Sequence, residues 1–250
     1  MLLLTVGCSG PEAQHFARSA AQSDGAREIR LFLEDLDTLL ERYRQKLNKR
    51  NPNAYNPETA PVIQEEILGQ SDTIRFHLAD GRILTSSYDY LQAAFEREKP
   101  RPYRNDLLII GIHKLIWEAY DRGAPHTWTA FEYDLEKLKK AHSLLQIVHW
   151  KIKTEKDWEG NYLFLTWQLN WQVELEKRLR QGEISSREVM QELQHIRDHK
   201  ETFLDCSNTS FSEIIETMIY ILGKTISVRG GEPATLGADM LTKAILFPIL

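Results

Sequence analysis

The chain has 250 residues, of which 42% are hydrophobic and 27% charged, which suits one large domain or two small ones with an apolar core. Nine Tyr, nine Phe and six Trp exclude a wholly disordered chain. The net charge of -5 and the pI of about 5.9 argue against a nucleic-acid partner, because the average field repels phosphate. Two cysteines are too few for a disulfide framework, and every apolar run is shorter than the roughly 20 residues of a membrane span.

The first residues contain the one recognisable targeting signal in the sequence. Residues 1–6 are mostly apolar, Gly7 is small, Cys8 follows, and the chain turns polar at once. This pattern resembles the end of a bacterial lipoprotein signal peptide, in which the cysteine is lipidated and becomes the new N-terminus. The resemblance implies a leader over residues 1–8, a lipid on Cys8 and a flexible polar tether over 9–29, followed by a single mainly helical domain over 30–250.

The resemblance also implies a location. A lipid on Cys8 would place the chain in the bacterial cell envelope, facing the periplasm, with the lipid as its sole membrane attachment. The alternative is a cytoplasmic protein in which Cys8 is incidental and the N-terminus is frayed. In either case Cys206 has no obvious cation beside it in sequence, so we expect an inert thiol there.

The first half of the chain predicts helices around one hairpin. Apolar residues recur at helical spacing over 30–49, and Asn51-Pro52 ends that helix. Strands over 73–78 and 82–86 flank an Asp80-Gly81 turn. Residues 106–120 are apolar on almost every side, which predicts the central buried helix, with Asn105 or Asp106 as its cap and Arg122-Gly123 as its end.

The second half predicts a further hairpin and more helices. A helix over 130–144 precedes two β-prone segments, 146–153 and 161–168. Helices are expected over 185–203, starting at Ser185 or Ser186, and over 210–222, while the spacing of Trp167 and Trp171 indicates core packing. The class is therefore α+β, predominantly α-helical, with a small antiparallel sheet from two hairpins.

One cluster has the spacing of metal ligands. Glu188, Glu192, His195 and His199 fall on one flank of the expected helix, and Glu-x-x-His is used in di-iron bundles. The more ordinary interpretation is a solvated flank in which Glu192 pairs with His195. We expect no stoichiometric metal and predict no cofactor, because a single helix supplies the well-placed ligands.

Other motifs favour structural roles. His113 is expected to be a neutral core histidine bonded to a backbone carbonyl, and His142 and His149 are expected to lie around the start of a strand. Gly223-Lys224-Thr225 lacks the earlier glycine of a phosphate-binding loop and lies in a helical pattern. The apolar end, 244–250, is expected to be buried in the fold or bound to a protein partner.

Three functions remain open from the sequence. The leading hypothesis is a non-catalytic envelope lipoprotein that acts by binding or scaffolding. The second is a metal-dependent enzyme that uses the strip from Glu188 to His199. The third is a cytosolic interaction protein with the apolar C-terminus as its docking segment.

Overall fold

The computed structural model describes residues 23–97, 103–123, 129–166, 177–191 and 206–234. Its helices are α2 (Asp24–Arg50), α3 (Ala60–Leu68), α4 (Ser87–Phe95), α5 (Arg104–Ala119), α6 (Leu135–Thr154) and α9 (Cys206–Val228). Two 3-10 turns, η1 (Pro52–Ala54) and η2 (Ala130–Glu132), and two strands, β1 (Phe76–His77) and β2 (Ile83–Leu84), complete the named elements. Residues 177–180 and 186–191 are also helical.

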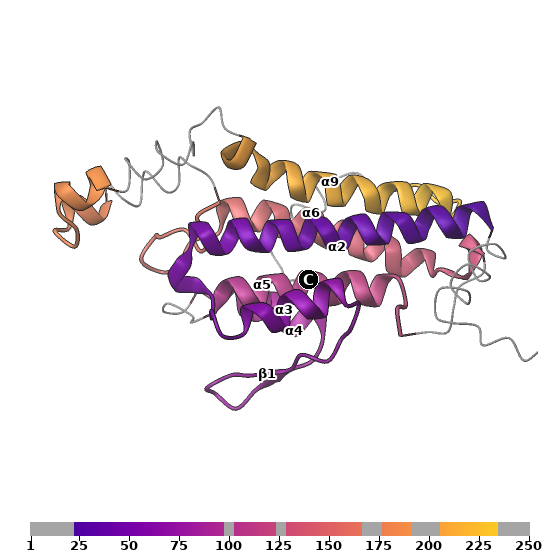
Figure 1. Ribbon diagram of the computed structural model, residues 1–250, viewed down its shortest axis with the longest axis horizontal. Coiled ribbons are helices and arrows are strands. Elements are labelled where there is room, and N and C mark those ends of the chain that lie inside the picture. Colours follow the sequence, from indigo (N-terminus) through magenta and orange to yellow (C-terminus); the bar gives the residue numbers. More distant parts are fainter. Residues whose placement is uncertain (1–22, 98–102, 124–128, 167–176, 192–205, 235–250) are drawn as a thin grey trace, which may run out of the picture.

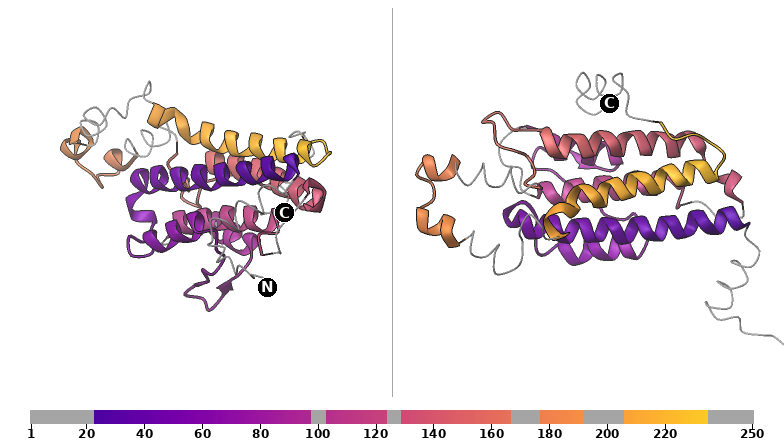
Figure 2. Two further views of the ribbon diagram at one scale, coloured as in Figure 1. Left: turned by 45° about the vertical axis from the view of Figure 1, so that its right-hand side comes forward. Right: turned by 90° about the horizontal axis from the view of Figure 1, so that it is seen from above.

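The helices form two layers. Seen from above, α9 lies between α2 and α6 (Figure 2), and it packs against both. Beneath them lies α5, which contacts α2 and α6, with α3 and α4 beside it (Figure 1). This position explains why α5 is apolar on almost every side, since it is covered from several directions. The predicted central buried helix is therefore confirmed.

The first long helix begins earlier than its sequence pattern indicates. The hydroxyl of Ser23 accepts a hydrogen bond from the Ala26 amide at 3.2 Å, and α2 starts at Asp24. Ala26 and Ile29 are fully buried and continue the apolar stripe of the helix. The predicted tether over 9–29 is thus too long at its C-terminal end, because residues 24–29 are part of the helical core.

The predicted caps of α5 are wrong. Tyr103, in a left-handed conformation with φ of 66°, precedes the helix and supplies no side-chain cap. Asn105 and Asp106 lie inside the first turn and are buried, where they bind the end of α2 and the chain that follows it. Tyr120 is the C-cap, so the helix ends before Arg122. The local pattern predicts that these side chains cap the helix, but in the structure they form tertiary hydrogen bonds instead.

The first predicted hairpin is confirmed, and it projects from the bundle (Figure 1). β1 and β2 pair antiparallel, with Phe76 opposite Leu84 and His77 opposite Ile83. Gly81 adopts a φ of 87°, which the tight connection requires and which glycine adopts at least cost.

The second predicted hairpin is wrong, because residues 146–153 lie in α6. Asp134 caps this helix by accepting the amides of Glu136 and Lys137 at 2.9 and 3.2 Å. The buried residues then recur at steps of three and four along its length: Leu138, Ala141, Leu145, Val148 and Ile152. α6 packs against both α9 and α5, and this tertiary packing overrides the local β propensity.

A short bridge remains of that hairpin. Lys156 pairs with Tyr162 across a turn in which the Asp157 amide donates to the Asn161 carbonyl at 2.8 Å. The helix predicted over 130–144 also starts later, since 130–132 form η2 and α6 begins at Leu135. The fold is a predominantly helical α+β arrangement with one small two-stranded sheet.

The last described helix, α9, is longer than the 210–222 segment that the sequence predicts. Gly223-Lys224-Thr225 lies in its interior, so the rejection of a phosphate-binding loop is confirmed. Gly230 turns the chain with a φ of 89°. No helix in the described ranges is long and apolar enough to span a membrane. Trp167, Trp171 and the apolar end 244–250 lie outside the described residues.

Candidate functional site

The structure describes one of the four candidate metal ligands. Glu188 is exposed at the start of the helical residues 186–191, whereas Glu192, His195 and His199 lie outside the described residues, as does Cys8. The Glu188 carboxylate accepts the Ser185 amide at 2.7 Å and its hydroxyl at 2.8 Å, while the Ser185 hydroxyl accepts the Glu188 amide. This is a reciprocal capping box, so Ser185 starts the helix as predicted.

The capping bonds give Glu188 a structural role. They lower the pKa of its carboxyl, with the backbone bond from Ser185 as the largest cause. Elsewhere in the described ranges, no group of three or more His, Cys, Asp or Glu side chains is arranged to hold a metal ion. The sequence-based candidate strip therefore remains a prediction for its other three residues.

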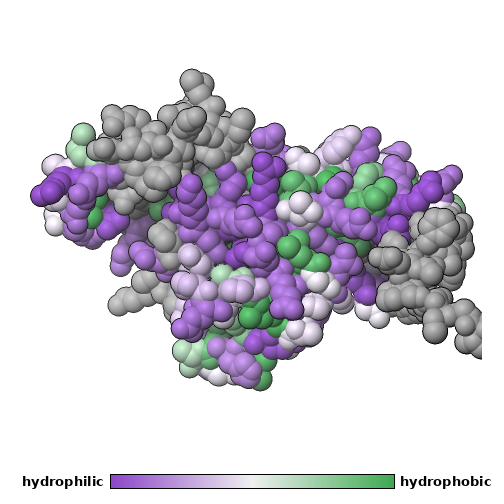
Figure 3. All heavy atoms as spheres, viewed as in Figure 1, coloured by the Kyte–Doolittle hydropathy of each residue, from purple (hydrophilic) through white to green (hydrophobic). Residues whose placement is uncertain are grey.

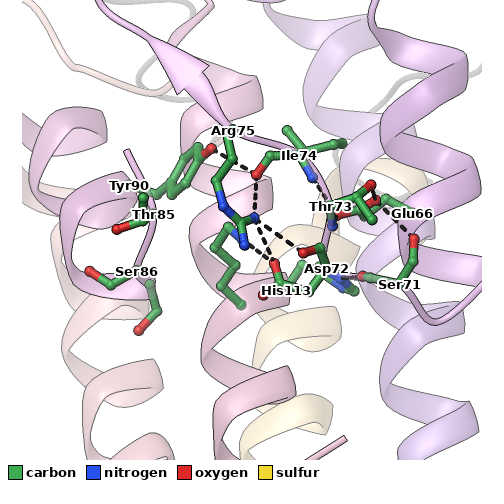
Figure 4. Close-up of polar contacts among 12 residues, drawn as sticks. Glu66, Ser71, Asp72, Thr73, Ile74, Arg75, Thr85, Ser86, Tyr90 and His113 are labelled. Atoms are coloured by element: carbon green, nitrogen blue, oxygen red, sulfur yellow. Dashed lines mark hydrogen bonds and ion pairs between the residues drawn. The ribbon is translucent and has the colours of Figure 1, made fainter. Parts of the chain in front are cut away.

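A polar cluster joins α3, α4, α5 and the segment that leads into β1 (Figure 4). Glu66, near the end of α3, is buried and receives four hydrogen bonds, from the Ser71 hydroxyl, from the amide and hydroxyl of Thr73, and from the Ile74 amide. Burial raises the pKa of Glu66, but the four donors outweigh that effect and the pKa is lowered. The carboxylate thus stays charged and holds the segment 71–74.

A buried lysine holds the same segment from the other side. The Lys114 side chain is 1% exposed and its ammonium pairs with the Asp72 carboxylate, whose side chain is 24% exposed. The ammonium also lies 5.5 Å from the centroid of the Tyr90 ring. Arg75 approaches the same carboxylate at 3.3 Å. The buried charge of Lys114 is therefore compensated by one carboxylate and one aromatic face.

Tyr90 fastens the entry to the hairpin. Its hydroxyl accepts the Phe76 amide at 2.8 Å and lies 3.3 Å from the Ile74 carbonyl, to which it donates. Burial raises the pKa of Tyr90 to about 12, with the Phe76 hydrogen bond as a smaller opposing effect. The phenol thus remains protonated at neutral pH and both donates and accepts a hydrogen bond at the entry to the hairpin.

His113 is the core histidine that the sequence predicts. Its Nε2 lies 2.7 Å from the Ser71 carbonyl and therefore carries the proton, while burial lowers the pKa of the ring. Its Nδ1 is buried and has no hydrogen-bond partner in the described structure. Together with Glu66, Lys114 and Tyr90, it clamps the segment 71–76 onto the bundle, so this cluster positions the hairpin and does not present a reactive group to solvent.

A second buried pair ties α2 to the end of α5. Asp37 and Arg122 are each 5% exposed and form an ion pair at 2.5 Å. Burial raises the pKa of Asp37 despite the Arg122 partner. Nearby, the hydroxyls of Tyr120 and Thr225 lie 2.7 Å apart and connect α5 to α9. These contacts join three helices across the core.

An open site in the described part of the chain is a groove between α6 and α9. It has a volume of about 500 Å³, within the range of ligand-binding pockets. Its walls come from both helices, and Pro233 and Ala234, just after α9, close one side. The principal lining residues are His142, Gln146, Ile219, Tyr220, Gly223 and Lys224.

Hydrogen bonds fix the chemistry of the groove floor. The amide nitrogen of Gln146 lies 3.2 Å from the Ala234 carbonyl, 3.4 Å from the His142 carbonyl and 3.0 Å from His142 Nδ1. Two carbonyl neighbours identify this atom as the donor, so His142 Nδ1 is an acceptor and Nε2 carries the proton. Burial lowers the pKa of His142, which keeps the ring neutral.

The ends of the groove differ in charge. Glu216 lines one end and Lys224 lies two turns along α9, with its ammonium 5.2 Å from the Tyr220 ring centroid. His149, beside Glu216, bonds to the Ser212 hydroxyl at 2.9 Å, and burial lowers its pKa to about 4. The groove thus combines a neutral donor, an exposed aromatic ring and charges of both signs around apolar walls.

Sequence reasoning missed this groove because it ended the helix at residue 144 and assigned Gln146 and the residues after it to a strand. His142 and His149 lie on a helix instead, one on the groove floor and the other near its acidic end. The available signal was the spacing of His142 and Gln146, four apart, which places both on one helical face. No protein-family model, curated protein or solved structure matches the chain.

Proposed function

We propose that the chain is a lipoprotein of the bacterial cell envelope, attached by a lipid at Cys8 and facing the periplasm, whose helical body acts by binding or scaffolding rather than by catalysis. The observation that carries the proposal is the Gly7-Cys8 junction, placed a short polar stretch ahead of Ser23, the cap of α2. A lipid at Cys8 would lie outside the folded body and leave its core undisturbed.

The intervening sequence supports this arrangement. Half of the residues from 9 to 22 are small, with four Ala, two Ser and one Gly. A flexible linker of this length would span about 20 Å on average, which suffices to hold a helical body clear of a membrane surface. The groove between α6 and α9 supports the binding role, since it offers a volume suited to a ligand or a peptide segment.

The test is to express the full chain in a bacterium and compare three forms. Wild type and Cys206→Ser should both sediment with membranes, while Cys8→Ser should be released to the soluble fraction. Cys206→Ser is the matched control, because it removes the other cysteine of the chain. Mass spectrometry of the N-terminal peptide should find the added lipid on Cys8. Equal membrane association of the Cys8→Ser form would contradict the proposal.

A further inference from the structure

The groove between α6 and α9 is directly continuous with the chain that leaves it. Pro233 and Ala234 line the groove, and the Gln146 amide holds the Ala234 carbonyl at 3.2 Å. The next residues, 235–250, therefore depart from the groove wall itself. Their last part, Ile245–Leu250, contains the large apolar side chains Leu246, Phe247, Ile249 and Leu250.

We propose that this apolar segment, Ile245–Leu250, docks into the groove between α6 and α9 of its own chain. The groove offers apolar contact through Ile219, Pro233 and the ring of Tyr220, which is 62% exposed. Covering Tyr220 and filling the groove would remove apolar surface of both partners from water. An apolar stretch so close to an apolar-walled groove meets it at a high effective concentration.

The dimensions allow the chain to fold back. From Glu216 to Ser227 the groove extends along α9 by roughly 17 Å, at 1.5 Å of helical rise per residue. Six residues in extended conformation cover about 20 Å, and Pro248 favours such a conformation. Residues 235–244 can reach about 33 Å when extended, so the connection is long enough for the segment to return along the groove.

Polar atoms of the groove also suit an extended peptide. His142 Nε2–H lies on the side of Gly223, 3.6 Å from the position that a Cβ would take there. A backbone carbonyl of the docked segment can accept a hydrogen bond from this donor. Lys224 and Glu216 lie at different positions along α9 and leave the apolar part of the lining between them. The segment itself is uncharged from Ile245 to Leu250 apart from any chain terminus.

Gly223 provides a sharp test of occupancy. A Cβ at this position would make ordinary contacts, 3.6 Å to His142 and to Pro233, so Gly223→Ala fits. A leucine there would extend into the groove and exclude the docked segment. The two variants have the same backbone requirement, since Gly223 lies in a helix, and they differ chiefly in how much of the groove they fill.

The experiment uses the full chain with a photo-cross-linking amino acid at Tyr220, irradiated at low protein concentration and analysed by mass spectrometry. The expected product is an intramolecular cross-link to the peptide that contains Ile245–Leu250. Gly223→Leu should reduce its yield at least fivefold, and Gly223→Ala should preserve it. The same probe at Leu31, which is 51% exposed on α2, is the control and should not give this product.

Four results would overturn the proposal. They are no cross-link from position 220 to the segment, a cross-link that appears only between two copies, equal yields from positions 220 and 31, or an unchanged yield in a folded Gly223→Leu variant. Helical circular dichroism verifies that each variant is folded. The yield does not depend on a lipid at Cys8, so this proposal and the proposed function succeed or fail separately.

Discussion

Asp106 shows how one residue can be stabilising in one protonation state and costly in the other. Its side chain is fully buried at the start of α5 and accepts the Asn56 amide at 2.8 Å, with the Thr59 hydroxyl at 3.5 Å. Its Oδ1 has no hydrogen-bond partner in the described part of the chain. Burial, the largest effect, raises the pKa of Asp106 to about 6, although these donors and Arg44 oppose it.

A pH-dependent stability follows from this shift. The pKa of Asp106 is about 6 in the folded state and near 3.8 in the unfolded state, so between these values the folded protein binds a proton that the unfolded chain has released. Its contribution is therefore fully present below pH 4 and lost as the pH rises through 6. The stability of wild type relative to Asp106→Asn should fall by about 2 to 3 kcal/mol between pH 4 and pH 7.

Urea unfolding of both proteins at several pH values provides the measurement. Taking the difference between the two proteins removes the contributions of other titrating groups, such as Asp37 and Glu66, that are common to both. A difference that stays constant over this range would show that Asp106 ionises with its ordinary pKa in the folded protein, and a difference that grows with pH would show that its pKa is lowered. Either result would contradict the prediction.

At the scale of elements, the contact between α4 and α5 depends on a glycine, which has no side chain to separate the two helices. A Cβ added at Gly111, in the middle of α5, would lie 2.9 Å from two side-chain atoms of Leu91 and 3.1 Å from its backbone nitrogen. These distances are shorter than van der Waals contact, and the Leu91 backbone cannot yield without moving α4. Gly111 therefore permits the close approach of these two helices.

Two glycine-to-alanine substitutions should consequently have opposite effects. Gly111→Ala should destabilise the protein by about 1 to 3 kcal/mol, because overpacking outweighs the gain in helix propensity. Gly223→Ala, in α9, meets no contact shorter than 3.6 Å and should be neutral or stabilising by up to about 1 kcal/mol. Thermal unfolding by circular dichroism measures both, and the prediction is wrong if Gly111→Ala matches or exceeds the stability of wild type.

At the scale of the whole molecule, the last described helix completes a core that the first one begins. α9 packs against both α2 and α6 in the upper layer, although residues 51–205 separate it from α2 along the chain (Figure 2). Its buried apolar residues are Phe211, Ile214, Ile215, Met218, Leu222 and Ile226, with Ile221 beside them. The face of the molecule seen in Figure 3 is mostly hydrophilic, as expected if these side chains are used inside.

Cooperative folding should therefore require α9. Each large buried apolar side chain contributes about 1.5 to 3 kcal/mol, so the seven on α9 contribute about 10 to 20 kcal/mol, which is as large as the typical net stability of about 5 to 15 kcal/mol. A chain that ends at residue 205 should show no cooperative urea transition. A chain that ends at residue 234 keeps α9 and should retain one. Cooperative unfolding of the shorter chain would contradict this view of the core.

Much of the helical architecture was readable in the sequence. Helical periodicity and capping involve residues within a few positions of each other, so they can be recognised locally. Such local signals are the apolar stripe along residues 30–49, the apolar character of 106–120 on almost every side, and the capping serine Ser185. The role of His113 also followed, since a histidine on a buried helix is most often a neutral ring that bonds to a nearby backbone carbonyl. The Asp80-Gly81 hairpin was predictable for the same reason.

The candidate site was much less predictable. The groove needs α6 and α9 side by side, and sequence reasoning had assigned residues 146–153 to a strand. Its floor depends on a hydrogen bond between Gln146 and Ala234, which are far apart in the chain. The clamp on the hairpin likewise brings Lys114 to Asp72 from a separate helix. Such contacts leave no short-range pattern that could have been recognised.

By itself, the sequence determined the class of the fold, the central helix and the first hairpin, whereas lipidation at Cys8 stays a prediction. The tertiary structure decided that 146–153 is helical, that α2 begins at Asp24, and that Asn105 and Asp106 bind neighbouring chain instead of capping a helix. The physical reason is the sequence separation of the residues that interact. Periodicity and turns are set by neighbours along the chain, whereas an ambiguous apolar segment adopts the conformation that buries it best against a distant partner, here α9.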